Sequence, residues 1–194
     1  ELGTLHDGPA MVLFDEGLIP RAVLGVIKGL PRLDIHDVKG KRRAVLGETP
    51  DGSPRLELYS AKGQRRARLG IQADTANLGL YDQTGRPRLG LNVLAHGEPI
   101  LIFIDKNEKI QASLDLLPDG TAGLTINDKD GRASLWLGAR LEGLGLTIFD
   151  KDGTSRAVLG STSLEAIGTG AITERPESSL VLFNREGRVI WSTP

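Results

Sequence analysis

Apolar and polar positions along the chain follow one alternating pattern, which is clearest around residue 60. Leu56 and Leu58 alternate with polar residues on the way into a turn at Ser60–Gly63. After the turn, Ala67 and Leu69 alternate with arginine and glycine. Alternation with a period of two is typical of a β-strand that has one apolar face. The pattern therefore predicts a β-hairpin whose two strands present aliphatic side chains to the same side.

This hairpin pattern recurs eight times along the chain. The polar residue that begins each turn is followed by the next after 22 or 23 residues, except for a final interval of 34. The eight residues are Asp15, Asp37, Ser60, Asp82, Asp105, Asp128, Asp150 and Asn184. Two and four positions before each of them, and seven positions after it, the residue is apolar in every repeat. Such periodicity predicts an all-β fold of tandem hairpins that form an elongated array, either β-prism-like or solenoid-like.

The spacing also predicts how the chain is organised. Seven tandem hairpins occupy residues 1–160, and an eighth, terminal hairpin occupies residues 179–194. Residues 161–178 interrupt the period, so we interpret them as an inserted loop, with an extra short strand at Ala166–Ile167 or Ala171–Ile172 as one alternative. We expect all of these parts to belong to one continuous repeat domain.

The turns have a recognisable composition. Glycine, which tolerates a positive φ, occupies the third position after the first turn residue in six repeats. In the other two repeats, Gly17 and Asn107 stand one position earlier, and we expect them to adopt the left-handed conformation. Both aliphatic rows face the same side only if the loop contains an even number of residues. A two-residue loop such as Lys62-Gly63 and a four-residue loop both remain open.

The apolar face of such a ribbon must be covered in water. Three coverings remain open: two sheets packed face to face, a monomeric solenoid, and copies of the chain meeting around a symmetry axis. Alanine occurs at the seventh position after the turn residue in five repeats, which makes the predicted core thin. A thin core suits a self-associated three-fold prism, in which each of three chains supplies one hairpin per layer.

The other face is polar, aromatic and rich in arginine. The residue before the turn is often aromatic, and the sixth residue after it is arginine in five repeats. With an even loop these two positions lie opposite each other, so arginine can stack on the aromatic ring. Regularly spaced guanidinium groups and rings can also bind a glycan or a polyanion. The candidate ligand-binding residues are Arg21, Arg43, Arg66, Arg88, Tyr59 and Tyr81.

Composition argues against several other classes of protein. The net charge is −1, so there is no electrostatic case for binding nucleic acid. No apolar run reaches the roughly 18 residues of a membrane span, and we expect no membrane insertion of this segment. The chain has no cysteine, so it has no disulfide framework. Because it begins with Glu1 rather than methionine, we expect it to be a processed or excised part of a longer protein.

Motifs for catalysis or metal binding are weak. Asp128–Gly131 and Asp150–Gly153 resemble the start of a calcium loop, but leucine stands where the distal glutamate ligand belongs, which favours a simple turn. The three histidines, His6, His36 and His96, have no accompanying nucleophile motif. We therefore expect no enzymatic activity, no catalytic residues, no metal and no cofactor.

Taken together, the repeats resemble the β-structured shafts of extracellular and viral fibres, in which short strands and Gly/Pro turns repeat. They do not match the shorter repeat of the triple β-spiral, so the resemblance concerns architecture. It implies a structural shaft or filament segment at the extracellular, cell or virion surface, built from copies of itself as a homo-oligomer such as a homotrimer. The alternative is a β-repeat binding module that uses the Arg/aromatic face.

Overall fold

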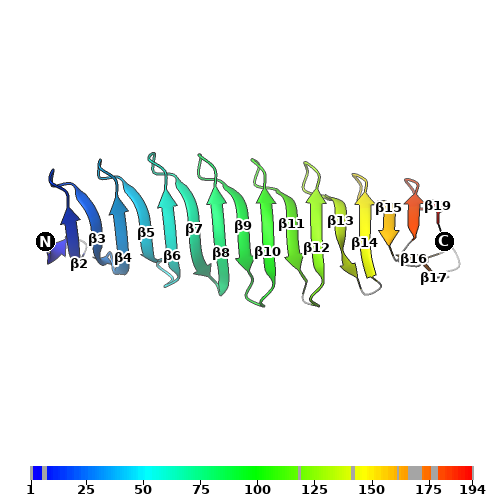
Figure 1. Cartoon of the computed structure of the whole chain (residues 1–194), viewed down its shortest axis with the longest axis horizontal. Coiled ribbons are helices and arrows are strands. Elements are labelled where there is room, and N and C mark those ends of the chain that lie inside the picture. Colours follow the sequence, from blue (N-terminus) through cyan, green and yellow to red (C-terminus); the bar gives the residue numbers. More distant parts are fainter. Residues whose placement is uncertain are drawn as a thin grey trace. The chain divides into compact units, whose positions relative to one another are not determined.

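The protein is an all-β chain of consecutive antiparallel hairpins, as the repeat predicts (Figure 1). The computed structural model describes residues 2–5, 8–117, 119–140, 143–160, 162–165, 172–175 and 179–193, and none of these residues is helical. The chain divides into two compact units, Glu1–Gly97 and Glu98–Pro194. Each unit is described below by itself.

The first unit is one antiparallel sheet in which each strand pairs with the next strand along the chain. Its strands are β1 (Leu2–Leu5), β2 (Gly8–Phe14), β3 (Pro20–Ile27), β4 (Leu30–His36), β5 (Arg42–Glu48), β6 (Pro54–Tyr59), β7 (Arg65–Gln72), β8 (Thr75–Tyr81) and β9 (Pro87–Val93). Every connection is therefore a local hairpin, which keeps strand pairing close in sequence.

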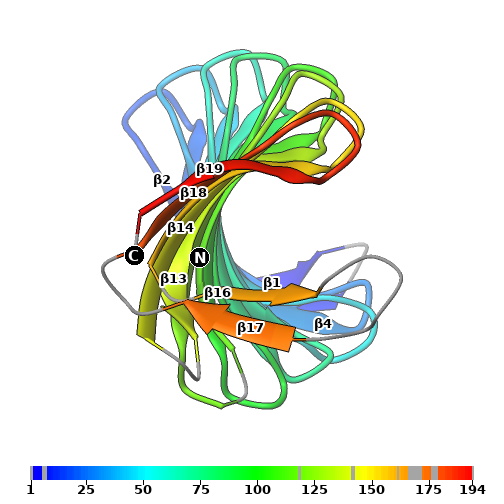
Figure 2. The same ribbon diagram turned by 90° about the vertical axis from the view of Figure 1, so that its right-hand side faces the viewer.

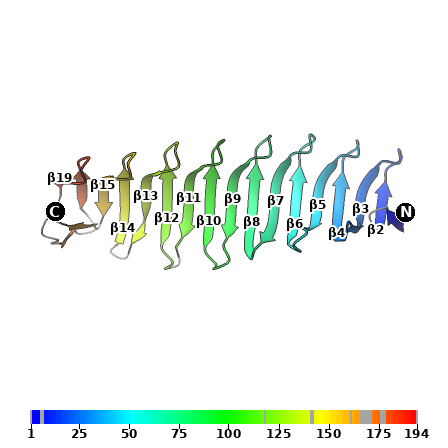
Figure 3. The same cartoon turned by 180° about the vertical axis from the view of Figure 1, so that it is seen from behind.

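The second unit repeats this arrangement (Figure 3). Its main sheet contains β10 (Pro99–Ile104), β11 (Ile110–Leu116), β12 (Ala122–Asn127), β13 (Ala133–Arg140), β14 (Gly143–Phe149), β15 (Ser155–Gly160), β18 (Leu180–Phe183) and β19 (Val189–Ser192). Strand β18 pairs directly with β15, so the main sheet continues across the interruption of the repeat.

The interrupting segment contains a small hairpin of its own. Strands β16 (Thr162–Glu165) and β17 (Ile172–Arg175) pair with each other and form a separate two-stranded sheet. Of the two predicted extra strands, Ala166–Ile167 lies outside the described residues. The other begins at Ala171, which is also outside them, but Ile172 is the first residue of β17.

The predicted alignment of the aliphatic rows is confirmed. Within one hairpin, Leu58 lies opposite Ala67 and Leu56 lies opposite Leu69. In the next strand pair, Leu69 lies opposite Leu78. Because directly opposite residues in an antiparallel sheet point to the same side, the rows form one continuous apolar face in each unit.

The predicted even-numbered loop is wrong. The backbone N–H of Ser60 donates to the carbonyl of Gln64 (2.8 Å) and that of Gly63 donates to the carbonyl of Ser60 (2.9 Å), so only three residues lie between Ser60 and Gln64. Gly63 has a φ of 82°. A β-bulge between Leu58 and Tyr59 shifts the register by one residue. The bulge compensates for the odd loop, which is why the aliphatic rows still coincide.

The expectation for Gly17 and Asn107 is also wrong. The left-handed residues are Leu18 (φ 56°) and Glu108 (φ 64°), which occupy the same third position as glycine elsewhere. Their backbone N–H groups donate to the carbonyls of Asp15 and Asp105, as the turn glycines do in the other repeats. The hydrogen bonding of the turn therefore sets which position has a positive φ, and the residue there conforms to it.

Within a single chain, the aliphatic rows are more exposed than the opposite face. Leu46 and Leu69 of the aliphatic rows are 56% and 54% exposed, whereas Val45 and Glu57 on the other face are 2% and 6% exposed. The first unit has no second sheet among its described residues, so a face-to-face sandwich is wrong there. Figure 2 shows that the strands bend. Side chains converge on the concave side of a bent sheet and diverge on the convex side, so we infer that the aliphatic rows lie on the convex side.

Glycines on the concave side permit close approach of neighbouring backbones. Gly25 lies opposite Ala10, Gly47 opposite Arg32, and Gly70 opposite Arg55. A Cβ atom added at Gly47 would lie 2.5 Å from the Cβ of Arg32 and 2.7 Å from the carbonyl oxygen of Pro31. The cross-strand glycines therefore make room at the point where the concave side is most crowded.

The variant Gly47→Ala tests this role of glycine. We expect it to lower the free energy of unfolding by about 1–3 kcal/mol, because the new methyl group must displace backbone atoms of β4. Gly123→Ala is the matched control, since its Cβ would approach only side-chain atoms, at 3.3 Å from Trp136 and 3.5 Å from Asp115. Urea unfolding followed by circular dichroism measures both. Equal stability of the two variants would contradict the proposed crowding.

Candidate functional site

The first candidate surface is the convex, apolar face. Its exposed members in the first unit are Met11, Leu13, Leu24, Val26, Ile35, Leu46, Leu56, Leu58, Leu69, Ile71, Leu80, Leu91 and Val93. Those in the second unit are Phe103, Leu114, Leu116, Ile126, Leu137, Leu144, Ile148, Leu159 and Trp191. Each of these side chains is at least 37% exposed. We call the two sets the apolar face of each unit.

The size of the apolar face is unusual for a surface that stays in water. If each exposed side chain leaves on the order of 50 Å² accessible, the thirteen in the first unit give roughly 650 Å². The largest apolar patch on a soluble monomer is roughly 300–600 Å². A standard protein–protein interface buries about 800 Å² per partner. The apolar face of one unit is therefore close in area to an interface.

The opposite, concave side carries buried charges that neutralise one another. The Glu57 carboxylate accepts hydrogen bonds from the Tyr59 hydroxyl (2.6 Å), Arg55 Nε (3.2 Å) and Arg65 Nη1 (2.9 Å). Burial is the largest single influence on the pKa of Glu57, and it raises the pKa by opposing ionisation. The hydrogen bonds from Tyr59 and Arg65 and the charge of Arg55 together lower the pKa by more. The pKa of Glu57 therefore lies below its usual value. This cluster is a structural ion-pair network.

Aspartates stabilise the turns at one end of the strands. Asp37 Oδ1 accepts hydrogen bonds from the backbone N–H groups of Lys39 (2.9 Å) and Lys41 (3.0 Å). The N–H of Lys41 is the largest cause of the lowered pKa of Asp37. Ser60 Oγ and Asn184 Oδ1 make the same two backbone contacts without a charge. These contacts explain why the first turn residue is Asp, Ser or Asn.

Most of the predicted ligand-binding arginines are paired with a turn aspartate. The distances are 3.4 Å for Arg21–Asp15, 3.6 Å for Arg43–Asp37 and 2.6 Å for Arg88–Asp82. Arg156, which is not one of the predicted residues, has the same position in its repeat and lies 3.8 Å from Asp150. Arg66 differs, because Ser60 replaces the aspartate in its repeat. Its Nε donates to the carbonyl of Tyr81 at 2.9 Å, which links it to the next repeat.

The two predicted tyrosines contact arginines other than the expected ones. The bulge places Arg65 opposite Tyr59, so the predicted pairing of Tyr59 with Arg66 is wrong. Instead, the guanidinium of Arg42 lies 5.1 Å from the Tyr59 ring centroid, and that of Arg65 lies 4.5 Å from the Tyr81 ring centroid. Each contact joins an arginine to the aromatic residue of the following repeat, so the stacking holds repeats together.

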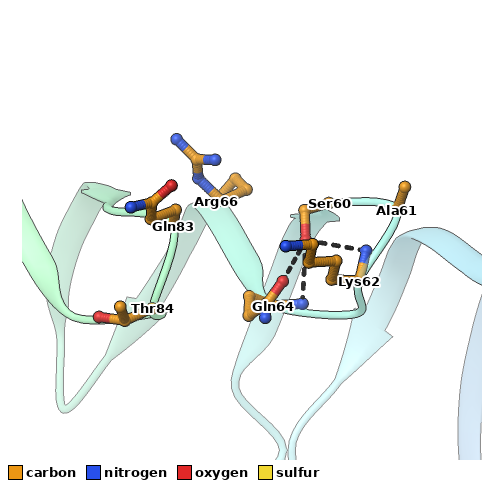
Figure 4. A pocket seen from close by; sticks show the side chains of 7 residues that line it. All are labelled: Ser60, Ala61, Lys62, Gln64, Arg66, Gln83 and Thr84. Atoms are coloured by element: carbon orange, nitrogen blue, oxygen red, sulfur yellow. Dashed lines mark hydrogen bonds between the residues drawn. The ribbon is translucent and has the colours of Figure 1, made fainter.

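A hollow lies between two neighbouring turns of the first unit (Figure 4). It has a volume of about 520 Å³ and is lined by Ser60, Ala61, Lys62, Gln64, Arg66, Gln83 and Thr84. Among the predicted ligand-binding residues, only Arg66 lines it. The repeat pattern does not predict the other lining residues, although Ser60 departs from it by standing where most repeats have aspartate.

The aspartate pairs that resemble a calcium loop serve as turns. Asp128 Oδ1 accepts the N–H groups of Asp130 (2.8 Å) and Arg132 (3.0 Å). Asp130 itself pairs with Lys129 (3.1 Å) and Lys109 (3.7 Å). The predicted turn is thus confirmed. Over the described part of the chain, no three or more His, Asp or Glu side chains gather as a metal site would require.

No protein-family model matches this chain, and no curated protein matches it either. The architecture places it in the class of all-β hairpin-repeat proteins. In the described segments we find no helix with the length and apolarity needed to cross a membrane.

The variant Glu57→Gln tests the buried network. At neutral pH we expect it to be about 1–3 kcal/mol less stable, because Arg55 and Arg65 lose an ionised partner. A lowered pKa in the folded state stabilises the protein above the unfolded pKa, and this contribution disappears as pH falls through the folded pKa. The wild type should therefore lose stability below about pH 4.3, and Glu57→Gln should lose less.

Urea midpoints measured between neutral and acidic pH give both the stability difference at neutral pH and the loss of stability in acid. The remaining acid sensitivity of Glu57→Gln belongs to the turn aspartates, whose pKa values are also lowered. Glu16→Gln, at an exposed turn position, is the control and should follow the wild type. A Glu57→Gln profile parallel to that of the wild type at all pH values would contradict the network.

Proposed function

We propose that this protein is a non-enzymatic structural repeat protein that self-associates through its apolar face. The observation that carries the proposal is the run of aliphatic side chains on the convex side, which nothing within the described part of either unit covers. Covering about twenty half-exposed side chains would stabilise an assembly by roughly 1 kcal/mol or more for each one.

A second copy of the chain is a suitable partner for this face. The face consists of repeated leucine rows, so two copies offer each other the same spacing and the same lack of charge. The concave side is less suited to burial in an assembly, since its centre already contains the paired charges of Arg55, Glu57 and Arg65. Three such faces around an axis would form the three-fold prism suggested by the thin Leu/Ala rows.

In this proposal the repeats form a shaft or filament segment of an extracellular, cell-surface or virion-surface assembly. Support comes from the regular hairpin period and from contacts that link successive repeats. Arg21, Arg43 and Arg66 each donate through Nε to a carbonyl of the next repeat. Such a chain can set length and rigidity by the number of its repeats.

The double variant Leu46→Lys/Leu69→Lys tests the proposal. The wild type should sediment as an oligomer, and a homotrimer would support the prism. Two lysines at half-exposed positions of the apolar face should shift the protein to monomer, because their charges would be buried without partners in the interface. Val38→Lys is the matched control, since Val38 is 63% exposed in a turn outside the apolar face.

Sedimentation equilibrium of the full chain measures the mass, and circular dichroism reports whether the β-structure persists. Val38→Lys should keep the mass of the wild type. A compact, stable wild-type monomer in dilute solution would overturn the proposal. So would an oligomer that the double substitution leaves unchanged.

A further inference from the structure

The hollow between the turns of the third and fourth repeats differs from the equivalent positions of other repeats. One wall is the turn Ser60–Gln64 with Arg66, and the other is Gln83 and Thr84 (Figure 4). Two departures coincide in the third repeat alone: serine stands where six repeats have aspartate, and glutamine stands four positions later, where five repeats have lysine or arginine. Both changes affect the same hollow.

The first substitution leaves a guanidinium group without a carboxylate. Arg21, Arg43 and Arg88 each contact the aspartate of their own turn. Arg66 occupies the same position in the repeat, but Ser60 has no charge to offer. Within the described residues, no carboxylate lies within ion-pair distance of Arg66, whose Nε is already bonded to the Tyr81 carbonyl. Its two terminal nitrogens are available for a ligand.

The second substitution leaves the space between the turns open. In the second and sixth repeats the cation at this position reaches the next turn. Lys41 Nζ donates to the Ala61 carbonyl (3.5 Å), and Arg132 Nη1 donates to the Lys151 carbonyl (3.2 Å). Gln64 instead accepts a hydrogen bond from Ser60 Oγ (2.6 Å) within its own turn. No side chain at this position therefore bridges the third turn to the fourth.

The charge around the hollow is positive. Its lining includes Lys62 and Arg66 but no carboxylate. The acidic residue of the adjacent turn is Asp82, and both of its carboxylate oxygens already accept hydrogen bonds. Its Oδ2 accepts from Arg88 Nε (2.9 Å) and Nη2 (2.6 Å), and its Oδ1 accepts from Thr84 and Arg86. Asp82 therefore does not neutralise Lys62 or Arg66.

We propose that this hollow binds an oxyanionic group, either a sulfate or a carboxylate, on a polar ligand such as an acidic saccharide. The terminal nitrogens of Arg66 form the fork that suits a planar or tetrahedral oxyanion, and Lys62 adds a second positive charge. The amides of Gln64 and Gln83 provide hydrogen-bonding groups for the neutral part of the ligand. The Thr84 hydroxyl donates its hydrogen to Asp82 and can accept one from the ligand. The site lies in one chain and does not depend on self-association.

Calorimetric titration of the full chain tests this site with four probes: glucose 6-sulfate, glucuronate, inorganic sulfate and glucose. The sulfate and carboxylate probes should bind saturably, and glucose should not. Arg66→Gln should weaken binding by about threefold to tenfold, as expected for the loss of one charged contact at a partly exposed site. Tighter binding of glucose 6-sulfate than of inorganic sulfate would support a role for the sugar.

The variant Ser60→Asp is the sharpest test. It restores the aspartate that other repeats use, so the turn should remain folded while Arg66 gains an internal partner. We expect anion binding to fall by about tenfold or more. Arg43→Gln is the matched control, because Asp37 already neutralises Arg43 and its loss should not alter the affinity.

Two results would overturn the proposal. One is the absence of saturable binding by every anionic probe. The other is unchanged affinity in both Ser60→Asp and Arg66→Gln, with both variants folded by circular dichroism. Equal binding of inorganic sulfate and glucose 6-sulfate would support the oxyanion site and confine recognition to the anion.

Discussion

The structure depends on one constraint, which is that the aliphatic residues of both strands of every hairpin point to the same side. Leu56, Leu58, Ala67 and Leu69 satisfy it through direct cross-strand pairing. A three-residue loop alone would break this alignment, since an odd loop shifts the return strand by one residue. The β-bulge next to Tyr59 restores it. The turn and the bulge therefore act as one device that preserves the apolar face through successive repeats.

The bend of the strands then makes the two faces unequal. On the concave side, side chains crowd together, glycines such as Gly47 make room, and charges such as Glu57 are buried with partners. On the convex side, leucines spread apart and remain about half exposed. A single chain thus buries paired charges on its concave side and leaves its apolar face about half exposed. This imbalance is the physical basis of the proposal that the chain is one part of an assembly.

Because the repeats are regular, a residue that departs from the pattern marks a local difference in structure. An arginine that pairs with its own turn aspartate is part of the scaffold in several repeats. Where Ser60 and Gln64 replace the usual residues, the same scaffold leaves a positive hollow between two turns. A repeat protein can acquire a local site in this way, because one unit can lose a structural contact while its neighbours continue to hold the sheet together.

The sequence by itself determined the all-β class, the hairpin period and the register of the aliphatic rows, because these follow from local alternation and turn spacing. It also identified Arg66 as a candidate, although as one of several equivalent arginines. It did not reveal the bulge, since a compensated odd loop and an even loop both align Leu58 with Ala67. Only the tertiary structure decided which face is buried, because burial depends on the bend of the strands. The lining of the hollow by Lys62, Gln64 and Gln83 was likewise decided there, since it brings together turns that are one repeat apart in the sequence.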